Sequence, residues 1–384
     1  MHLTLRICAP LVFLLSLVAF AGPAIGQPAL RCDLSSQPGA TLLLPYFEVD
    51  AADPGGRTTY FAVGSNSTDA TVARVVMWTN WGHPVLAFDV GLEPGSVRSF
   101  NARDLIAGRL PTTEPPPADD ERYRSCASPI RLPNVDPDNL ASLLAGEPRV
   151  VDGLCYAEPV EDGRLLTGYL TVDIVNNCSG SRGPTPQDSG YFGDCASGLA
   201  SNENALWGDF FLVDSAGNYA QGEKLVSVPA DQTRFGNDVC IDPPCGIRIG
   251  SSFWYAEGNR TPLPVAYETR FLRGGDFDGG TELILWTKGQ IGPAECGAPE
   301  PEGRPRLELV ARTERGQPLD SQVIPSPYLT RRLTLGGVDV PMAEGFGRLG
   351  IEAEGRQLWV MPLISAEQRF GVGLGATPVA DLCF

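Results

Sequence analysis

The chain has 384 residues, of which 43% are hydrophobic, and its 46 acidic residues outnumber its 29 lysines and arginines to give a formal net charge of −17. This length and apolar content suffice for more than one folded core, and the negative charge repels nucleic acid phosphates. Nucleic acid is therefore excluded as an expected partner. The 44 glycines and 34 prolines exceed ordinary globular usage and indicate many turns.

The first 26 residues have the three parts of a secretory signal peptide. Arg6 precedes an apolar run over 11–20, and Ala24-Ile25-Gly26, with a small residue at each end, follows at the cleavage position. We expect residues 1–26 to be cleaved and the mature protein to be secreted or periplasmic. No later segment reaches the roughly 18 apolar residues of a membrane-spanning helix, so we expect no membrane span after cleavage.

Alternating apolar and polar residues predict strands along most of the remaining chain. Residues 86–92 place their apolar side chains on one face, and a turn at 93–96 leads into a returning strand at 97–101. The same alternation predicts strands at 60–63, 71–78, 169–175, 206–213, 281–286, 307–311, 349–353, 358–364 and 370–374. Many short strands with Gly and Pro between them predict an all-β fold of antiparallel sandwiches, immunoglobulin-like, with loop insertions.

Helical periodicity is rare. The segment 139–145 predicts a helix, with Asp138 as its N-cap and Gly146 after its end. We expect only a few such short helices.

A weak internal repeat predicts two related sandwiches. Residues 79–85 and 313–319 share the pattern Thr-x-x-Gly-x-Pro-apolar, and further matches follow in the same order, 168–172 with 347–351 and Leu206-Trp207 with Leu358-Trp359. We therefore expect a first domain over 27–235, enlarged by insertions near 110–160 and 178–204, and a second domain over 236–384.

Three longer phrases of the sequence carry a resemblance. The residues 41–50 (TLLLPYFEVD), 168–173 (GYLTVD) and 274–281 (GGDFDGGT) resemble uncharacterised exported, β-rich bacterial proteins of unknown function. That resemblance implies export and β-rich architecture, and it brings no activity, substrate or site residue.

Nine cysteines follow residue 26, so at least one has no partner within the chain. Export would place them in an oxidising compartment, where cysteines form disulfides. Proximity in the sequence predicts the pairs Cys178–Cys195 and Cys240–Cys245, and Cys126–Cys155 and Cys296–Cys383 complete the set, which leaves Cys32 over.

One acidic loop is a candidate calcium site. Asp276, Asp278 and Glu282 lie on a Gly-rich turn before a predicted strand, and alternate carboxylates on such a turn are suited to calcium. The loop is similar to the Asp-x-Asp-x-Asp-Gly loops of integrin-type propeller repeats, but it is one residue shorter and lacks the third Asp. A solvated turn is the competing interpretation, and we expect no other cofactor.

Catalytic motifs do not assemble in the sequence. His83 is the only histidine after residue 26, and it falls in the predicted turn 81–84, which is typical of a surface histidine. Residues 345–350 match Gly-x-Gly-x-x-Gly, but a predicted strand follows them where a dinucleotide site needs a helix. Carboxylate pairs for glycan chemistry remain open, with Glu48, Asp50, Asp173 and Asp209 among the acids.

The six tryptophans divide by their predicted context. Trp81 and Trp254 with Tyr255 lie in turns, where they are able to stack on a sugar or a partner, whereas four others fit strand positions in a core: Trp78, Trp207, Trp286 and Trp359. Packing is the expected role of all six.

These features predict an exported, non-catalytic binding or structural protein whose partner is an extracellular protein or a glycan. Two alternatives stay open. One is a carboxylate-dependent enzyme acting on glycans, which requires a cleft with two facing acids. The other is a calcium-stabilised adhesion module, which requires the loop at Asp276 to bind the ion.

Overall fold

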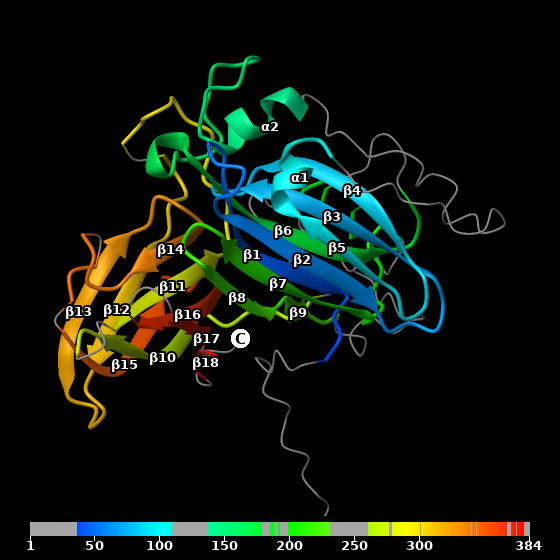
Figure 1. The fold of residues 1–384 in the computed structure, drawn as a ribbon. Helices are drawn as coiled ribbons and strands as arrows, with labels where there is room; N and C mark the ends of the chain where they lie inside the picture. The colour runs from blue at the N-terminus through cyan, green and yellow to red at the C-terminus, as the bar shows by residue number, and fades with distance from the viewer. Residues whose placement is uncertain are drawn as a thin grey trace, which may run out of the picture.

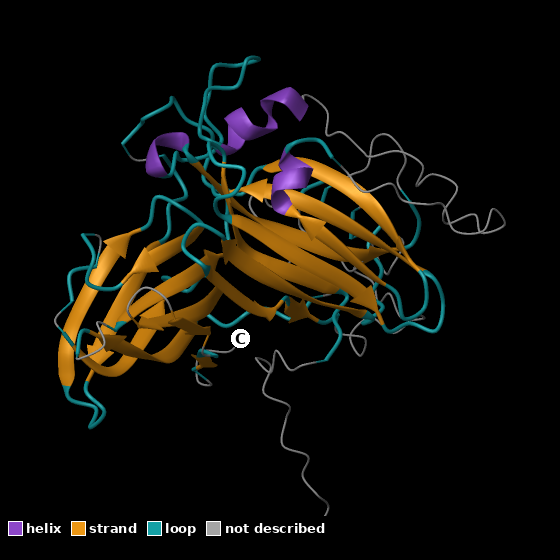
Figure 2. Ribbon diagram, viewed as in Figure 1, coloured by secondary structure: helices purple, strands orange, loops and turns teal. Residues whose placement is uncertain are grey.

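A computed structural model describes residues 37–109, 137–178, 185–188, 191–192, 199–230, 260–275, 279–299, 301–338, 340–342, 344–366, 370–373 and 375–379. These residues form two antiparallel β sandwiches that lie side by side (Figures 1 and 2). The all-β fold predicted from the alternation is confirmed. In the described part of the chain, helical structure is limited to α1 (Ala102–Ile106), α2 (Pro137–Leu144) and a 3-10 turn at Glu161–Gly163.

The first sandwich contains the strands β1 to β9. A five-stranded sheet has the order β4-β3-β6-β1-β9, and a four-stranded sheet has the order β5-β2-β7-β8. The strands are β1 (Thr41–Asp50), β2 (Thr58–Ser65), β3 (Thr71–Thr79), β4 (Pro84–Leu92), β5 (Val97–Asn101), β6 (Leu165–Val175), β7 (Leu206–Asp214), β8 (Tyr219–Lys224) and β9 (Val226–Val228).

The second sandwich contains the strands β10 to β18. Its sheets have the orders β13-β12-β15-β10-β18 and β14-β11-β16-β17. The strands are β10 (Ala266–Arg273), β11 (Gly280–Thr287), β12 (Arg306–Arg312), β13 (Pro318–Pro325), β14 (Thr330–Thr334), β15 (Gly345–Glu352), β16 (Leu358–Ala366), β17 (Phe370–Gly373) and β18 (Thr377–Pro378).

The two sandwiches have the same topology. When β1 is matched with β10 and each later strand with its successor, every pairing of the first sandwich recurs in the second. The repeated turn agrees in detail, because Thr79 N donates to His83 O at 2.8 Å and Thr313 N donates to Gln317 O at 2.8 Å. Gly82 and Gly316 both adopt a positive φ, at 81° and 78°, which explains the glycine in the shared pattern. The short sequence repeat therefore reflects a repeated fold.

The first sandwich differs from the second by two insertions. The chain between β5 and β6 carries α1 and α2, and the chain between β6 and β7 spans 176–205, whereas the matching links of the second sandwich are short. Helix α2 covers residues 139–144 of the segment 139–145 that was predicted to be helical, and its side chains Leu140, Leu143 and Leu144 are buried. The helix starts at Pro137, so Asp138, which was predicted to be the N-cap, lies within the first turn instead. Proline suits the first helical position because its missing N–H has no partner there.

Each sandwich has its own core between its two sheets. Residues 86–92 of β4 alternate as predicted, with Leu86, Phe88, Val90 and Leu92 in the core of the first sandwich. In this sandwich β1, β3 and β6 are buried along their whole length. The outer faces of these strands are covered by residues 191–192 and 199–200 and by the second sandwich, which adds Trp286 to the cluster that contains Trp78 and Tyr169.

The repeated turn of the first sandwich lies at the junction between the two sandwiches. Trp81 is buried, and its indole N–H donates to the carbonyl of Pro327 at 3.1 Å. The side chain of His83 is also buried, and its Nε2 lies 2.8 Å from the carbonyl oxygen of Ile291, while its Nδ1 lies 3.0 Å from Nε2 of Gln290. The prediction of a surface histidine was wrong, because the second sandwich covers a turn that the local sequence marks as exposed.

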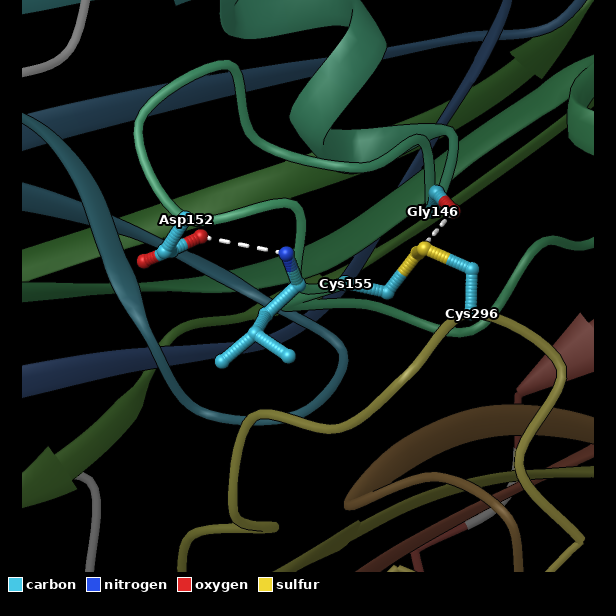
Figure 3. Close-up of a disulfide and its surroundings, with 5 residues drawn as sticks. Gly146, Asp152, Cys155 and Cys296 are labelled. Carbon is cyan, nitrogen blue, oxygen red and sulfur yellow. Dashed lines mark hydrogen bonds between the residues drawn. A yellow bond between two sulfur atoms is a disulfide. The ribbon is translucent and has the colours of Figure 1, made fainter.

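A disulfide between described residues joins the sandwiches (Figure 3). Cys155, in the insertion of the first sandwich, is bonded to Cys296, in the loop after β11, with Cα atoms 5.1 Å apart. The backbones also pair there, since Cys155 N donates to Ala294 O at 2.9 Å. The sulfur of Cys155 lies 2.7 Å from the carbonyl oxygen of Gly146, and because a disulfide sulfur carries no hydrogen this is a close contact rather than a hydrogen bond.

The disulfide corrects two pairings that sequence order had suggested. Cys155 does not pair with Cys126, and Cys296 does not pair with Cys383, because the fold brings together loops 141 residues apart. Cys178 is disulfide-bonded, and its pairing with Cys195 stays a prediction. The remaining predicted cysteines lie outside the described residues: Cys126, Cys195, Cys240, Cys245 and Cys383.

No helix among the described residues has the length and apolar character needed to cross a bilayer.

We expect the double substitution Cys155→Ser/Cys296→Ser to lower the free energy of unfolding by about 2–5 kcal/mol, because the bridge closes a long loop in the unfolded chain. Urea denaturation of the variant and the native protein measures this difference. Peptide mapping without reductant is the companion measurement. A peptide linking Cys155 to Cys126 would contradict the structure.

The burial of the His83 side chain makes the free energy of unfolding depend on pH. Burial lowers the pKa of His83 from 6.5 to about 4; the bond to Ile291 opposes the shift and the charge of Arg149 adds to it. The folded protein therefore takes up this proton only near pH 4, whereas the unfolded chain takes it up near 6.5. The contribution of the neutral His83 to the free energy of unfolding is therefore complete above pH 6.5. It falls by about 3 kcal/mol in total as the pH decreases to 4.

We expect His83→Gln to remove this component, so that the difference in unfolding free energy between the native protein and the variant shrinks from pH 7 to pH 4. Chemical denaturation at several pH values measures it. Parallel stability curves for the two proteins would contradict the buried, neutral histidine.

Candidate functional site

A polar cleft with a volume of about 360 Å³ lies between the two sandwiches. Strands β1 and β6 of the first sandwich form one wall, and β11 and β14 of the second form the other. Its lining residues are mostly charged or hydroxyl-bearing: Tyr46, Glu48, Arg57, Val160, Glu161, Leu165, Thr167, Glu282, Tyr328, Thr330, Arg331, Arg332 and Thr334.

Arg332 connects two carboxylates across this cleft. Its Nη1 lies 3.1 Å from Oε1 of Glu48 on the first sandwich, and its Nη2 and Nε lie 2.5 and 2.9 Å from Oε2 of Glu282 on the second. Glu48 is buried and also accepts a hydrogen bond from the hydroxyl of Tyr46 at 3.0 Å. The cluster is therefore an ion pair shared between the two sandwiches.

The electrostatics of the cluster favour a permanent positive charge at its centre. Burial disfavours the charge of Arg332, but the carboxylates of Glu48 and Glu282 outweigh it and raise the pKa of the guanidinium. Burial and the nearby Glu48 raise the pKa of Tyr46, so this phenol keeps its proton and donates it. Arg57, at the rim, forms a second ion pair with Glu161 at 3.2 Å.

The cleft brings together two acids, as an enzyme acting on glycans would require. Such an enzyme needs one carboxyl protonated and directed at the leaving group, with the other free to act as base or nucleophile. Here Glu48 and Glu282 both accept hydrogen bonds from the same guanidinium. Of the other acids considered from the sequence, Asp50 pairs with Arg164 at 2.9 Å, and Asp173 is buried and accepts from Tyr191 at 2.8 Å.

The candidate calcium residues are only partly described. Asp276 and Asp278 lie outside the described residues, and Glu282 lies on β11. Both carboxylate oxygens of Glu282 accept hydrogen bonds, Oε2 from Arg332 and Oε1 from Thr334 at 3.2 Å. Across the described ranges, no three acidic, histidine or cysteine side chains gather in the geometry of a metal site.

A second candidate site is the outer face of the four-stranded sheet of the first sandwich. Tyr60 on β2 and Trp207 and Phe211 on β7 have exposed fractions of 44%, 41% and 46%. Tyr60 pairs directly with Phe211 across the two strands, and the pair Ala62 and Asp209 lies between this row and Trp207. We call Tyr60, Trp207 and Phe211 the aromatic face.

Glycines on the neighbouring strands let two of these rings lie along the sheet. A Cβ at Gly64 would come within 2.6 Å of the indole of Trp207, and one at Gly222 would come within 2.5 Å of the ring of Phe211. Each ring thus occupies the space that a neighbouring side chain would fill. Trp207 also borders a hollow of about 200 Å³ that reaches Trp359 of the second sandwich.

Among the described tryptophans, Trp207 lies in a different environment from the one inferred from the sequence, whereas the buried Trp81 agrees with the packing role expected of it. Trp207 was expected to pack in a core and is exposed, whereas Trp81, in a turn, is buried at the junction. Trp78 and Trp286 are buried as expected, and Trp359 packs partly against both neighbouring clusters. Trp254 and Tyr255 lie outside the described residues.

We expect Glu48→Gln to lower the free energy of unfolding by about 1–3 kcal/mol, because it weakens a buried ion pair between the sandwiches. The matched control is Glu268→Gln, which removes the same charge from an exposed pair with Arg348 and should change stability by less than about 0.5 kcal/mol. Urea denaturation of both variants checks this. Equal losses would show that the cluster does not hold the junction.

No family model matches the sequence, and no curated protein or solved structure matches it. The two sandwiches can still be compared with each other. Trp207 on β7 corresponds to Trp359 on β16, and the outer face of β11 and β16 contributes Ile284, Met361 and Leu363 to the core cluster of the first sandwich. The same sheet face is therefore covered in the second sandwich and exposed, with its aromatic side chains, in the first.

Proposed function

We propose that this protein is an exported, non-catalytic binding protein that holds a neutral glycan against the aromatic face of its first sandwich. The observation that carries the proposal is the arrangement of Trp207 and Phe211, whose rings lie over Gly64 and Gly222 on an uncovered sheet. Large exposed aromatic side chains on one face mark an interaction surface.

The shape of the aromatic face suits an extended sugar chain. Trp207 and Phe211 are four residues apart on one strand, which places them roughly 13 Å apart along the sheet. The apolar side of a sugar ring packs on an aromatic ring, while its hydroxyl groups need hydrogen-bonding partners. Asp209 lies between the two rings, and Ser99 and Lys224 occupy the same row on neighbouring strands and supply such partners.

The contacts in the cleft support a non-catalytic role. Glu48 and Glu282 are both committed to Arg332, and both ring nitrogens of His83 are engaged with the second sandwich. These groups stabilise the junction between the sandwiches. In this arrangement Glu48, Glu282 and His83 serve as structural groups.

Export is part of the proposal. A disulfide between the two sandwiches suits an oxidising compartment, which is where a cleaved signal peptide would deliver the chain. Expression with the native leader, followed by N-terminal sequencing of the extracellular or periplasmic fraction, tests this part. Intact protein in the cytosol with reduced cysteines would contradict it.

We expect the purified protein to be retained by at least one neutral polysaccharide in a panel of cellulose, chitin, xylan and mannan, and Trp207→Ala to weaken that binding at least tenfold. Loss of a stacking ring removes apolar contact area worth about 1.4 kcal/mol or more, which is a factor of ten. Affinity electrophoresis and depletion assays measure it.

The matched control is Phe346→Ala, which removes an exposed ring from the second sandwich, where the exposed fraction is 59%. It should leave binding to the neutral polysaccharides unchanged. The proposal fails if no polysaccharide of the panel binds, or if both substitutions weaken binding equally. Release of reducing sugar by the native protein would contradict the non-catalytic role.

A further inference from the structure

On the outer face of the five-stranded sheet of the second sandwich, positively and negatively charged side chains lie in separate groups. Arg312 on β12, Arg348 on β15 and Arg270 on β10 are direct neighbours across the three strands, and all three are exposed. We call them the arginine row. Like charges directly opposite one another destabilise a sheet, so an anion that contacts this row would relieve the repulsion between the arginines.

An acidic pair lies on the same face at a fixed distance. Glu308 and Glu352 are also cross-strand neighbours, four residues from Arg312 and Arg348, or roughly 13 Å along the strands. Glu268, which lies opposite Gly350 between the arginine row and the acidic pair, forms an ion pair with Arg348 at 3.2 Å. Within the described residues, Arg270 and Arg312 form no ion pair and no side-chain hydrogen bond, so their guanidinium groups remain available.

We propose that the arginine row binds a linear acidic polysaccharide that crosses β12, β15 and β10 with its carboxylate groups against the three guanidinium groups. The three Cα atoms span roughly 10 Å, because neighbouring strands lie about 4.8 Å apart. Guanidinium groups bind carboxylates with two parallel hydrogen bonds, which gives the row a strong preference for this group.

The acidic pair selects a linear ligand over a flat anionic surface. A bilayer lying on this sheet would face Glu308 and Glu352 as well as the arginine row, and it would be repelled by them. A single chain running along the row contacts the arginines and leaves the acidic pair in solvent. The net charge of −17 is spread over the whole molecule, and salt screens it beyond about 8 Å at physiological ionic strength.

The test uses the full-length protein and fluorescently labelled oligogalacturonate, with binding measured by anisotropy at 50 and 200 mM salt. We expect saturable binding that weakens at the higher salt concentration, and at least a tenfold loss of affinity in Arg270→Gln/Arg312→Gln. The matched control is Arg98→Gln/Arg306→Gln, which removes two exposed arginines from β5 and from the far end of β12. It should bind as the native protein does.

Three results would overturn the proposal: no binding of oligogalacturonate at 50 mM salt, equal losses in the two double variants, or equal affinity for labelled neutral dextran. Tighter binding to vesicles that contain phosphatidylglycerol would also overturn it, in favour of a lipid surface. Trp207→Ala should leave oligogalacturonate binding unchanged, so the outcome is independent of the function proposed for the aromatic face.

Discussion

The packing of the second sandwich against the first is the constraint on which the rest of the structure depends. An antiparallel sheet with two apolar faces must cover both, and in the second sandwich the outer face of β11 and β16 is covered by the first sandwich. Cys155–Cys296, the Arg332 cluster and the buried turn at His83 all lie along this contact. They fix one arrangement of two units that share a topology.

This packing makes two similar units unequal. The repeated fold places a Leu-Trp pair at the start of β7 and of β16, yet Trp359 is partly covered and Trp207 is exposed. Here the contact between the sandwiches covers the outer face of β11 and β16, and the matching face of β2 and β7 keeps its aromatic side chains exposed. The aromatic face is this exposed surface, and this is why we assign binding to it rather than to the cleft.

Much of the fold was predictable from the sequence because it depends on local pattern. Alternation located eleven of the eighteen strands among the described residues but missed β1, β8, β9, β10, β13, β14 and β18. The turn pattern at Thr79 and Thr313 revealed the repeat, because Gly at positive φ is required in both turns. The insertions were also visible, since the spacing between matching segments differs between the two halves of the sequence.

The sites were not predictable in the same way. Alternation shows that a strand has two faces, but it does not show which face a distant unit covers, so Trp207 and His83 were both assigned to the wrong environment. Sequence order likewise misled the pairing of Cys155, whose partner is brought close only by the packing of the sandwiches.

The most direct test is hydroxyl-radical footprinting of the free protein at the level of single residues. It measures whether the matching sheet faces of the two sandwiches differ in solvent exposure. The structure requires Trp207, which is 41% exposed, to be oxidised faster than the partly covered Trp359, although the two residues occupy matching positions of the two sandwiches. Equal oxidation of Trp207 and Trp359, or faster oxidation of Trp359, would contradict the packing and, with it, the assignment of the aromatic face.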